Sequence, residues 1–222
     1  MACKAPDRPL RIGVLASGEG TNLQALLDTV HGREARVVAV VADRTSAAAL
    51  ARARDAGVAT AVFPIDDYPD RGARDGAIAD WLANRDVDLV VLAGYMALLT
   101  SPFLSRFPDA VVNVHPSLLP AFPGMRAIEQ ALDYGVKVFG VTVHFVLDDG
   151  GVDTGPVIVQ RAVELANATD AATVQEALRP VEHALLPEAV RLIARGAVAR
   201  DPENPRRTVV TAGETPAQAP HA

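Results

Sequence analysis

An asparagine and a histidine stand two residues apart in the segment Val111–Gly124, VVNVHPSLLPAFPG. Because Asn113 and His115 follow an apolar run, both side chains are expected on one face, at the carboxyl end of a strand. Open α/β sheets bind their ligands at that end. An amide donor beside a protonated imidazole suits the oxyanion that develops in acyl transfer. The alternative is a histidine that caps a proline-rich turn, and the accompanying Asn113 favours the functional interpretation.

An acidic, glycine-rich loop follows in the segment Leu147–Ile158, LDDGGVDTGPVI. Asp153 directly precedes the Thr-Gly-Pro that opens a strand, so it is better placed than Asp148 or Asp149 to be held rigidly. A carboxylate near His115 favours the charged form of that imidazole. The loop could also hold a divalent ion, but its spacing matches no calcium-binding loop. We interpret Asp148 and Asp149 as parts of a solvated turn.

A glycine-rich turn opens the segment Leu15–Leu27, LASGEGTNLQALL. A strand ends before Gly18, and a helix is expected to begin at Thr21 or Asn22. Glycines allow a ligand close to the backbone, and a helix N-terminus attracts anions, so the turn could bind a phosphate. It matches neither a Walker loop nor a dinucleotide fingerprint. An ordinary turn with Thr21 or Asn22 as the N-cap explains the segment equally well.

Several weaker signals have two interpretations each. Arg71 opens a helix and could bind an anion, although arginines at helix starts are common. The residues from Tyr95 to Leu99 follow a buried strand and could line a pocket or fill the core. Glu182 and His183 lie inside the last helix, where a salt bridge is the default expectation. No role is assigned to His31, His144 or His221.

The hydrophobic pattern predicts a doubly wound α/β fold. Continuous apolar runs indicate parallel strands buried on both faces. They are Arg11–Ala16, Arg36–Ala42, Thr60–Phe63, Val87–Ala93 and Ala110–Val114. The helices expected between them are Asn22–His31, Ser46–Ala56, Arg71–Asn84 and Pro102–Phe107. Ser46 and Asp70 are candidate N-caps, and Gly57 is a candidate residue after a helix end.

The second half of the chain predicts an antiparallel extension of the same, mostly parallel sheet. A helix is expected over Met125–Tyr134, and a long helix over Asp170–Arg195, kinked at Pro180 or Pro187. Lys137–Leu147 and Pro156–Val163 are expected to pair as antiparallel strands. We expect an N-terminal tail over residues 1–10, one domain over 11–200, and an extension over 201–222 with a disordered end.

The composition limits the classes of protein that are compatible with the chain. Its 222 residues are 50% hydrophobic and 22% charged, with a formal net charge of −6 and a single cysteine. No apolar stretch reaches the length of a membrane span, and no signal peptide is recognisable. The negative charge disfavours nucleic-acid binding, and one cysteine excludes an internal disulfide framework. We expect a cytoplasmic enzyme with small-molecule substrates.

The motifs SGEGTN, NVHPSLLPAFPG and VDTGPVI occur in this order and spacing. On these residues the chain resembles the phosphoribosylglycinamide formyltransferases, a family of folate-dependent enzymes, over about Arg11–Arg195. The resemblance implies a Rossmann-like formyltransferase fold. It also implies transfer of a formyl group from the co-substrate 10-formyltetrahydrofolate to the amino group of glycinamide ribonucleotide, in purine biosynthesis. Neither a metal nor a covalent enzyme intermediate is required.

The resemblance further implies roles for individual residues. Asn113, His115 and Asp153 match the catalytic set, with Asn113 also bordering the folate. The residues that would bind the ribonucleotide are Gly20, Thr21 and Asn22, at its phosphate, and Glu182, at its ribose or glycinamide end. Those that would border the folate are Arg71, Met96, Ala97, Leu98 and Leu99. Relatives often have an arginine in place of Ala97, so a folate contact is expected to be lost or replaced.

Other functions stay open at this point. A formyltetrahydrofolate deformylase would use the same catalytic set, but usually carries an additional N-terminal domain. A methionyl-tRNA formyltransferase would need a further domain and a basic surface, and a sugar-nucleotide formyltransferase has no reason for the GEGTN turn. A non-catalytic module that binds folate or nucleotide is the alternative from another class. A homodimer is compatible with the sequence, which identifies no interface.

Overall fold

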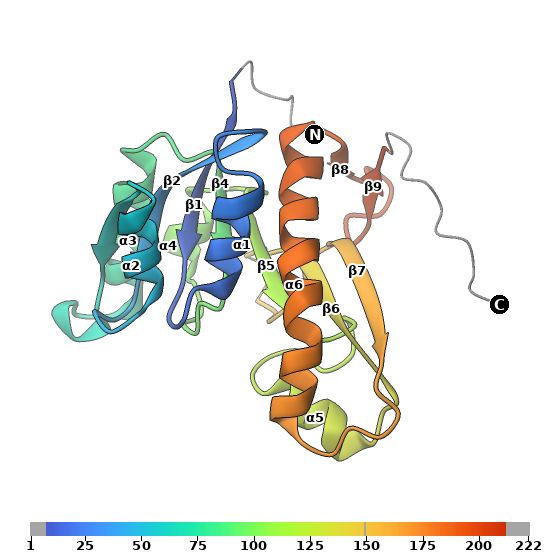
Figure 1. Ribbon diagram of the computed structural model, residues 1–222. Coiled ribbons are helices and arrows are strands. Elements are labelled where there is room, and N and C mark those ends of the chain that lie inside the picture. Colours follow the sequence, from blue (N-terminus) through green and yellow to red (C-terminus); the bar gives the residue numbers. More distant parts are fainter. Residues whose placement is uncertain (1–7, 149, 212–222) are drawn as a thin grey trace.

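The computed structural model describes residues 8–148 and 150–211 (Figure 1). Seven strands form one sheet in the order β3-β2-β1-β4-β5-β6-β7. Their bounds are β1 Leu10–Leu15, β2 Ala35–Ala42, β3 Ala59–Val62, β4 Leu89–Leu92, β5 Val111–His115, β6 Val138–Phe145 and β7 Val157–Glu164. Strands β1 to β5 are parallel, whereas β6 and β7 are antiparallel to their neighbours. The predicted fold class is therefore confirmed.

Helices cover both faces of the sheet (Figure 1). They are α1 Thr21–Thr29, α2 Ala49–Asp55, the 3-10 turn η1 Ile65–Asp67, α3 Arg71–Ala83, α4 Ser101–Leu104, α5 Ala127–Tyr134 and α6 Ala171–Ala194. Apolar side chains of α1, α2, α5 and α6 join one buried cluster, and those of α3 and α4 join another. No helix within the described residues is long and apolar enough to cross a membrane.

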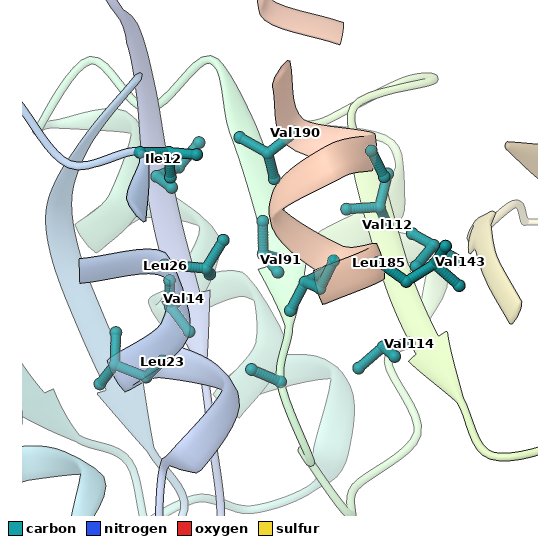
Figure 2. Close-up of a cluster of buried hydrophobic side chains, with 14 of the residues drawn as sticks. Ile12, Val14, Leu23, Leu26, Val91, Val112, Val114, Val143, Leu185 and Val190 are labelled. Carbon is teal, nitrogen blue, oxygen red and sulfur yellow. The ribbon is translucent and has the colours of Figure 1, made fainter. Parts of the chain in front are cut away.

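The continuous apolar runs arise because neighbouring strand residues enter different clusters. In β1, Val14 belongs to the cluster with α1 and α6, while Leu15 belongs to the cluster with α3 and α4. Figure 2 shows Val14 facing Leu23 and Leu26 of α1. Burial of such side chains contributes about 1.5–3 kcal/mol each. A strand covered on both faces needs apolar residues at successive positions, and in β1 the side chains of Ile12, Val14 and Leu15 are all fully buried.

Two of the predicted residues at helix ends are confirmed and two of the predicted N-caps are wrong, although α1 begins at Thr21 as expected. The Asp70 side chain accepts a hydrogen bond from Ala73 N at 2.8 Å, and Gly57 follows the end of α2 in the left-handed region. Ser46 does not cap α2, which begins at Ala49, because Gly18 O accepts the Ala49 N–H at 3.1 Å. Neither Thr21 nor Asn22 caps α1, since Gly20 occupies the N-cap position.

The end of the described chain adds a feature that the sequence pattern did not indicate. Strands β8 Val198–Arg200 and β9 Thr208–Val210 form an antiparallel pair, and Thr208 Oγ donates to the carbonyl of Val157 in β7. Helix α6 contains both Pro180 and Pro187, and its predicted kink stays a prediction. The predicted tail up to residue 7 and the predicted disordered end beyond residue 211 lie outside the described residues, as does Asp149.

Candidate active site

Four polar side chains meet where β5, β6 and the loop between β6 and β7 come together. Asn113 and His115 lie in β5, and the strand register places His144 of β6 directly opposite Asn113. Asp153 comes from the loop. Asn113 Nδ2 lies 3.3 Å from Asp153 Oδ1, and His115 Nδ1 lies 3.3 Å from Asp153 Oδ2. The predicted trio of Asn113, His115 and Asp153 is thus brought together in space.

The Asp153 carboxylate is held by donors on both oxygens. Gly124 N donates to Oδ2 at 2.8 Å, and His144 Nε2 lies 3.4 Å from Oδ1. Burial raises the pKa of Asp153, but the hydrogen bond from His144, the charge of His115 and the Gly124 N–H outweigh burial and lower it to about 2. Asp153 is therefore an anion at every pH at which the protein is expected to work.

His115 has an oxygen acceptor at each ring nitrogen. Its Nε2 lies 2.9 Å from Phe122 O, and its Nδ1 faces the Asp153 carboxylate. A carbonyl and a carboxylate can only accept, so this pattern matches a ring with a hydrogen on both nitrogens. The side chain is largely buried, with 7% of its surface exposed. The environment is therefore suited to an imidazolium that can donate a proton.

His144, for which the sequence pattern indicates no role, also belongs to the cluster. Its Nδ1 lies 2.8 Å from Phe145 O, and its Nε2 lies 3.3 Å from Asn113 Nδ2. The residue could have been found from strand register alone. An antiparallel β6 that pairs His115 with Thr142 must also pair Asn113 with His144.

The loop that carries Asp153 is shaped by its neighbours. Asp153 has φ 55°, in the left-handed region that aspartate tolerates better than most residues. A Cβ at Gly155 would lie 1.8 Å from Phe145 O, so only glycine allows the loop to pass this close to β6. Phe145 N also donates to Pro156 O at 2.9 Å. These contacts explain the Asp-Thr-Gly-Pro sequence and fix Asp153 against β5.

The glycine-rich turn places the N-terminus of α1 beside α6. Gly20 has φ 73°, and a Cβ there would lie 2.7 Å from the Ala49 backbone, so the turn requires glycine. Asn22 Nδ2 donates to Glu182 Oε2 at 2.7 Å. Burial raises the pKa of Glu182, against the opposing effect of the hydrogen bond from Asn22. The described hydrogen bond of Glu182 is therefore with α1, the charge of Arg179 in α6 lies nearby, and the expected salt bridge to His183 is not among the described contacts.

One cavity of about 700 Å³ connects these groups. Its lining contains every predicted site residue except Arg71: Gly20, Thr21, Asn22, Met96, Ala97, Leu98, Leu99, Asn113, His115, Asp153 and Glu182. Arg71 is the exposed first residue of α3 and is not part of the lining. Gln175 and Arg179 of α6 line the cavity as well. They share one helix face with Glu182, a spacing that could have indicated them.

The lining of the cavity has a polar part and an apolar part. The glycine-rich turn and the face of α6 provide polar groups, whereas Met96 and Leu98 are apolar lining residues that expose 59% and 55% of their surfaces. Within the described residues no group of three or more histidine, cysteine, aspartate or glutamate side chains is arranged to hold a metal ion. The Asn113, His115 and Asp153 side chains lie in the lining of the same cavity.

Comparison with known proteins agrees with this geometry. Residues 10–190 match the formyl transferase family. The phosphoribosylglycinamide formyltransferase of Mycobacterium tuberculosis H37Rv is 46% identical over 190 residues, which are 85% of this chain and 87% of that protein. The chain belongs to the phosphoribosylglycinamide formyltransferase family. The solved structure of glycinamide ribonucleotide transformylase 1 from Symbiobacterium toebii superposes with a TM-score of 0.86 at 45% identity, and covers 92% of this chain and 95% of that one.

Members of this formyltransferase family also occur within longer proteins. The trifunctional purine biosynthetic protein adenosine-3 of Bos taurus is 42% identical over 203 residues, which are 90% of this chain but 20% of that protein. The chain therefore spans about a fifth of the length of that relative.

Proposed function

We propose that the protein transfers the formyl group of 10-formyltetrahydrofolate to the amino group of glycinamide ribonucleotide, a step of purine biosynthesis. The observation that carries the proposal is the single cavity in which the Asn113, His115 and Asp153 cluster accompanies a glycine-rich helix N-terminus and an apolar wall. The family to which the chain belongs supports the same reaction.

The polar part of the cavity lining suits the ribonucleotide. The first amides of a helix have no acceptor within the helix and carry a partial positive charge, so Gly20, Thr21 and Asn22 would bind the phosphate. The Glu182 carboxylate, held by Asn22 at 2.7 Å, would accept hydrogen bonds from the ribose or glycinamide end. Arg179 lines the same cavity and adds a cation near Glu182.

The apolar part of the cavity lining suits the folate co-substrate. Met96, Ala97, Leu98 and Leu99 would border it, together with Asn113. Arg71 stays a predicted contact for the part of the folate that extends beyond the cavity lining. No arginine occupies position 97, so the cationic contact expected there from relatives is missing.

The chemistry follows from the charges of the cluster. The substrate amine attacks the formyl carbon, and negative charge develops on the formyl oxygen. An N–H of Asn113 would donate to that oxygen, a contribution of about 3–4 kcal/mol, and protonated His115 would be the second group that stabilises its charge. Collapse of the intermediate breaks the bond between the formyl carbon and the folate nitrogen, which receives the proton released by the amine. Asp153 would keep His115 charged and organise the path of that proton.

A deformylase would use water in place of the amine, and a binding module would need no catalytic cluster. The glycine-rich turn bound to Glu182 favours a phosphate-bearing amine over water. The four-residue cluster around Asp153 favours catalysis over binding alone. A homodimer and a cytoplasmic location stay predictions, which sedimentation equilibrium and cell fractionation would test.

The test is a formyl-transfer assay that follows the folate absorbance with and without glycinamide ribonucleotide. We expect loss of the formyl group only when the ribonucleotide is present, and no reaction in His115→Ala. Loss of the formyl group without ribonucleotide would identify a deformylase. Binding of both ligands without turnover would support the binding module.

A further inference from the structure

A buried ion pair lies beneath the loop that forms the apolar wall of the cavity. Arg74 and Asp75 of α3 expose 3% and 0% of their side chains, and the Arg74 guanidinium donates twice to Asp75 Oδ1, at 3.0 and 2.7 Å. Neither residue lines the cavity. A buried ion pair adds little to stability compared with apolar residues of the same volume, so its retention calls for another explanation.

The second oxygen of Asp75 explains the pair. Asp75 Oδ2 accepts both the backbone N–H and the hydroxyl of Thr100, each at 2.8 Å. Thr100 is the last residue of the irregular segment that follows β4, and it occupies the N-cap position of α4. The carboxylate thus joins α3 to the end of the loop, with Arg74 on one oxygen and Thr100 on the other.

The same loop is held at its beginning by another buried side chain. Ser17, which is 6% exposed, donates its backbone N–H to Gly94 O at 3.1 Å, and its hydroxyl accepts the Met96 N–H at 3.0 Å. Four of the residues predicted to border the folate, Met96 to Leu99, therefore lie in a segment with a side-chain anchor at each end. Tyr95 packs beside the ion pair, and burial raises the pKa of its hydroxyl to about 12, so it stays neutral there.

The Thr100 anchor also reaches the other wall of the cavity. The next residue, Ser101, donates its hydroxyl to Asp148 Oδ1 at 2.9 Å. Asp148 belongs to the loop that leads to Asp153. A displacement of Thr100 would therefore disturb the loop after β4 and the start of the loop after β6, while Asp153, β5 and the glycine-rich turn are held by separate contacts.

We propose that Asp75 is a positioning residue for the folate co-substrate: through Thr100 it fixes residues 95–99 in the shape that accepts the folate. The inference rests on the proposed function, because it assumes that folate binds against the apolar part of the cavity lining, Met96 to Leu99. Arg74 fills the other oxygen of Asp75 and so holds the carboxylate in place. Neither residue contacts the reacting atoms.

The test uses Thr100, because a substitution of Asp75 would leave the Arg74 charge buried and could prevent folding. Thr100→Val removes only the hydroxyl, and Thr100→Ser keeps it. We expect Thr100→Val to raise the KM for 10-formyltetrahydrofolate about tenfold, which equals about 1.4 kcal/mol. The KM for the ribonucleotide and kcat should change less than about twofold, and Thr100→Ser should resemble the wild type.

Thr29→Val is the matched control, because the Thr29 hydroxyl bonds to Ala25 O within α1 and touches neither loop. It should leave both KM values unchanged. Calorimetric binding of tetrahydrofolate gives a readout independent of turnover, and the Kd should rise about tenfold in Thr100→Val only. An unchanged Kd in Thr100→Val, or an equal rise in both KM values, would overturn the positioning role. A wild type that binds tetrahydrofolate without transferring formyl would overturn the proposed reaction instead, and the Kd comparison would still decide the role of Asp75. A wild type that binds no folate would overturn both.

Discussion

Replacing Asp153 by asparagine tests the centre of the mechanism with almost no change in shape. The variant Asp153→Asn keeps one oxygen that can accept from Gly124 N, at the position where the carboxylate accepts at 2.8 Å. It removes the negative charge that lies 3.3 Å from His115 Nδ1. The retained oxygen occupies the Oδ2 position, which also faces His115 Nδ1, so the amide nitrogen takes the Oδ1 position beside the donors of Asn113 and His144. The charged form of His115 therefore loses the negative charge that stabilises it, while the contact with Gly124 N is kept.

The size of the effect follows from the same contacts. Loss of a charged group that supports an oxyanion donor costs about 10²–10³ in kcat, so we expect turnover to fall by at least that factor. Stability should also fall. Lowering the Asp153 pKa from 3.8 to about 2 corresponds to about 2 kcal/mol in favour of the folded protein with an ionised carboxyl. For a chain of this size that is about 4–8 °C in Tm.

The assay combines kinetics with unfolding. The stability that depends on Asp153 is present above the ordinary pKa of an aspartate and is lost as the pH falls towards 2. Urea unfolding at several acidic pH values should therefore show a weaker pH dependence in Asp153→Asn than in the wild type. Asp66→Asn, an exposed change in η1, is the control and should behave like the wild type. Near-normal kcat in Asp153→Asn, with the fold intact, would refute the role given to this carboxylate.

Two further predictions concern the cavity and the loop that encloses it. Arg179→Ala should raise the KM for the ribonucleotide about tenfold to a hundredfold with little change in kcat, since Arg179 lines the cavity near Glu182 and a charged hydrogen bond to the substrate is worth about 1.5–3 kcal/mol. Steady-state kinetics beside Arg161→Ala, a surface change on β7, would show whether the effect is local. Gly155→Ala should lower the free energy of unfolding by about 3 kcal/mol, because its Cβ would lie 1.8 Å from Phe145 O. Gly76→Ala, with open space around its Cβ, should instead stabilise α3 by up to about 1 kcal/mol in the same denaturation experiment.

The sequence predicts those parts of the molecule that depend on local pattern. Strands β1 to β5 follow from apolar runs, and Asn113 and His115 follow from their place at the end of one run. The importance of Asp153 is predicted from its position directly before the Thr-Gly-Pro sequence, which restricts its loop. The place of His144 in the cluster depends on its pairing with Asn113, which lies 31 positions away on the neighbouring strand, so no local pattern indicates it. Ser46 failed as a cap because a carbonyl from another segment, Gly18 O, satisfies the helix.

Longer-range placement explains the remaining differences. The sequence places Arg71 at the start of a helix, but which cavity a helix start faces depends on how α3 packs against the sheet. The role inferred for Asp75 likewise depends on Thr100, which is 25 residues away and belongs to a loop. Neither residue type nor spacing reveals such a contact before the two segments are placed together.

The chemistry of this fold depends on a region of the sheet in which the strands are apolar on one face and polar on the other. In β5 and β6 alternate residues enter the core beside α6, and these are Val112, Val114, Val141 and Val143. The opposite face carries Asn113, His115, Thr142 and His144, where the loops after β5 and β6 take the place of a covering helix. A parallel β6 would require a crossover helix, which would cover this face. Because β6 runs antiparallel to β5, no crossover helix is needed and the polar face stays open to substrates, while the other face still stabilises the sheet.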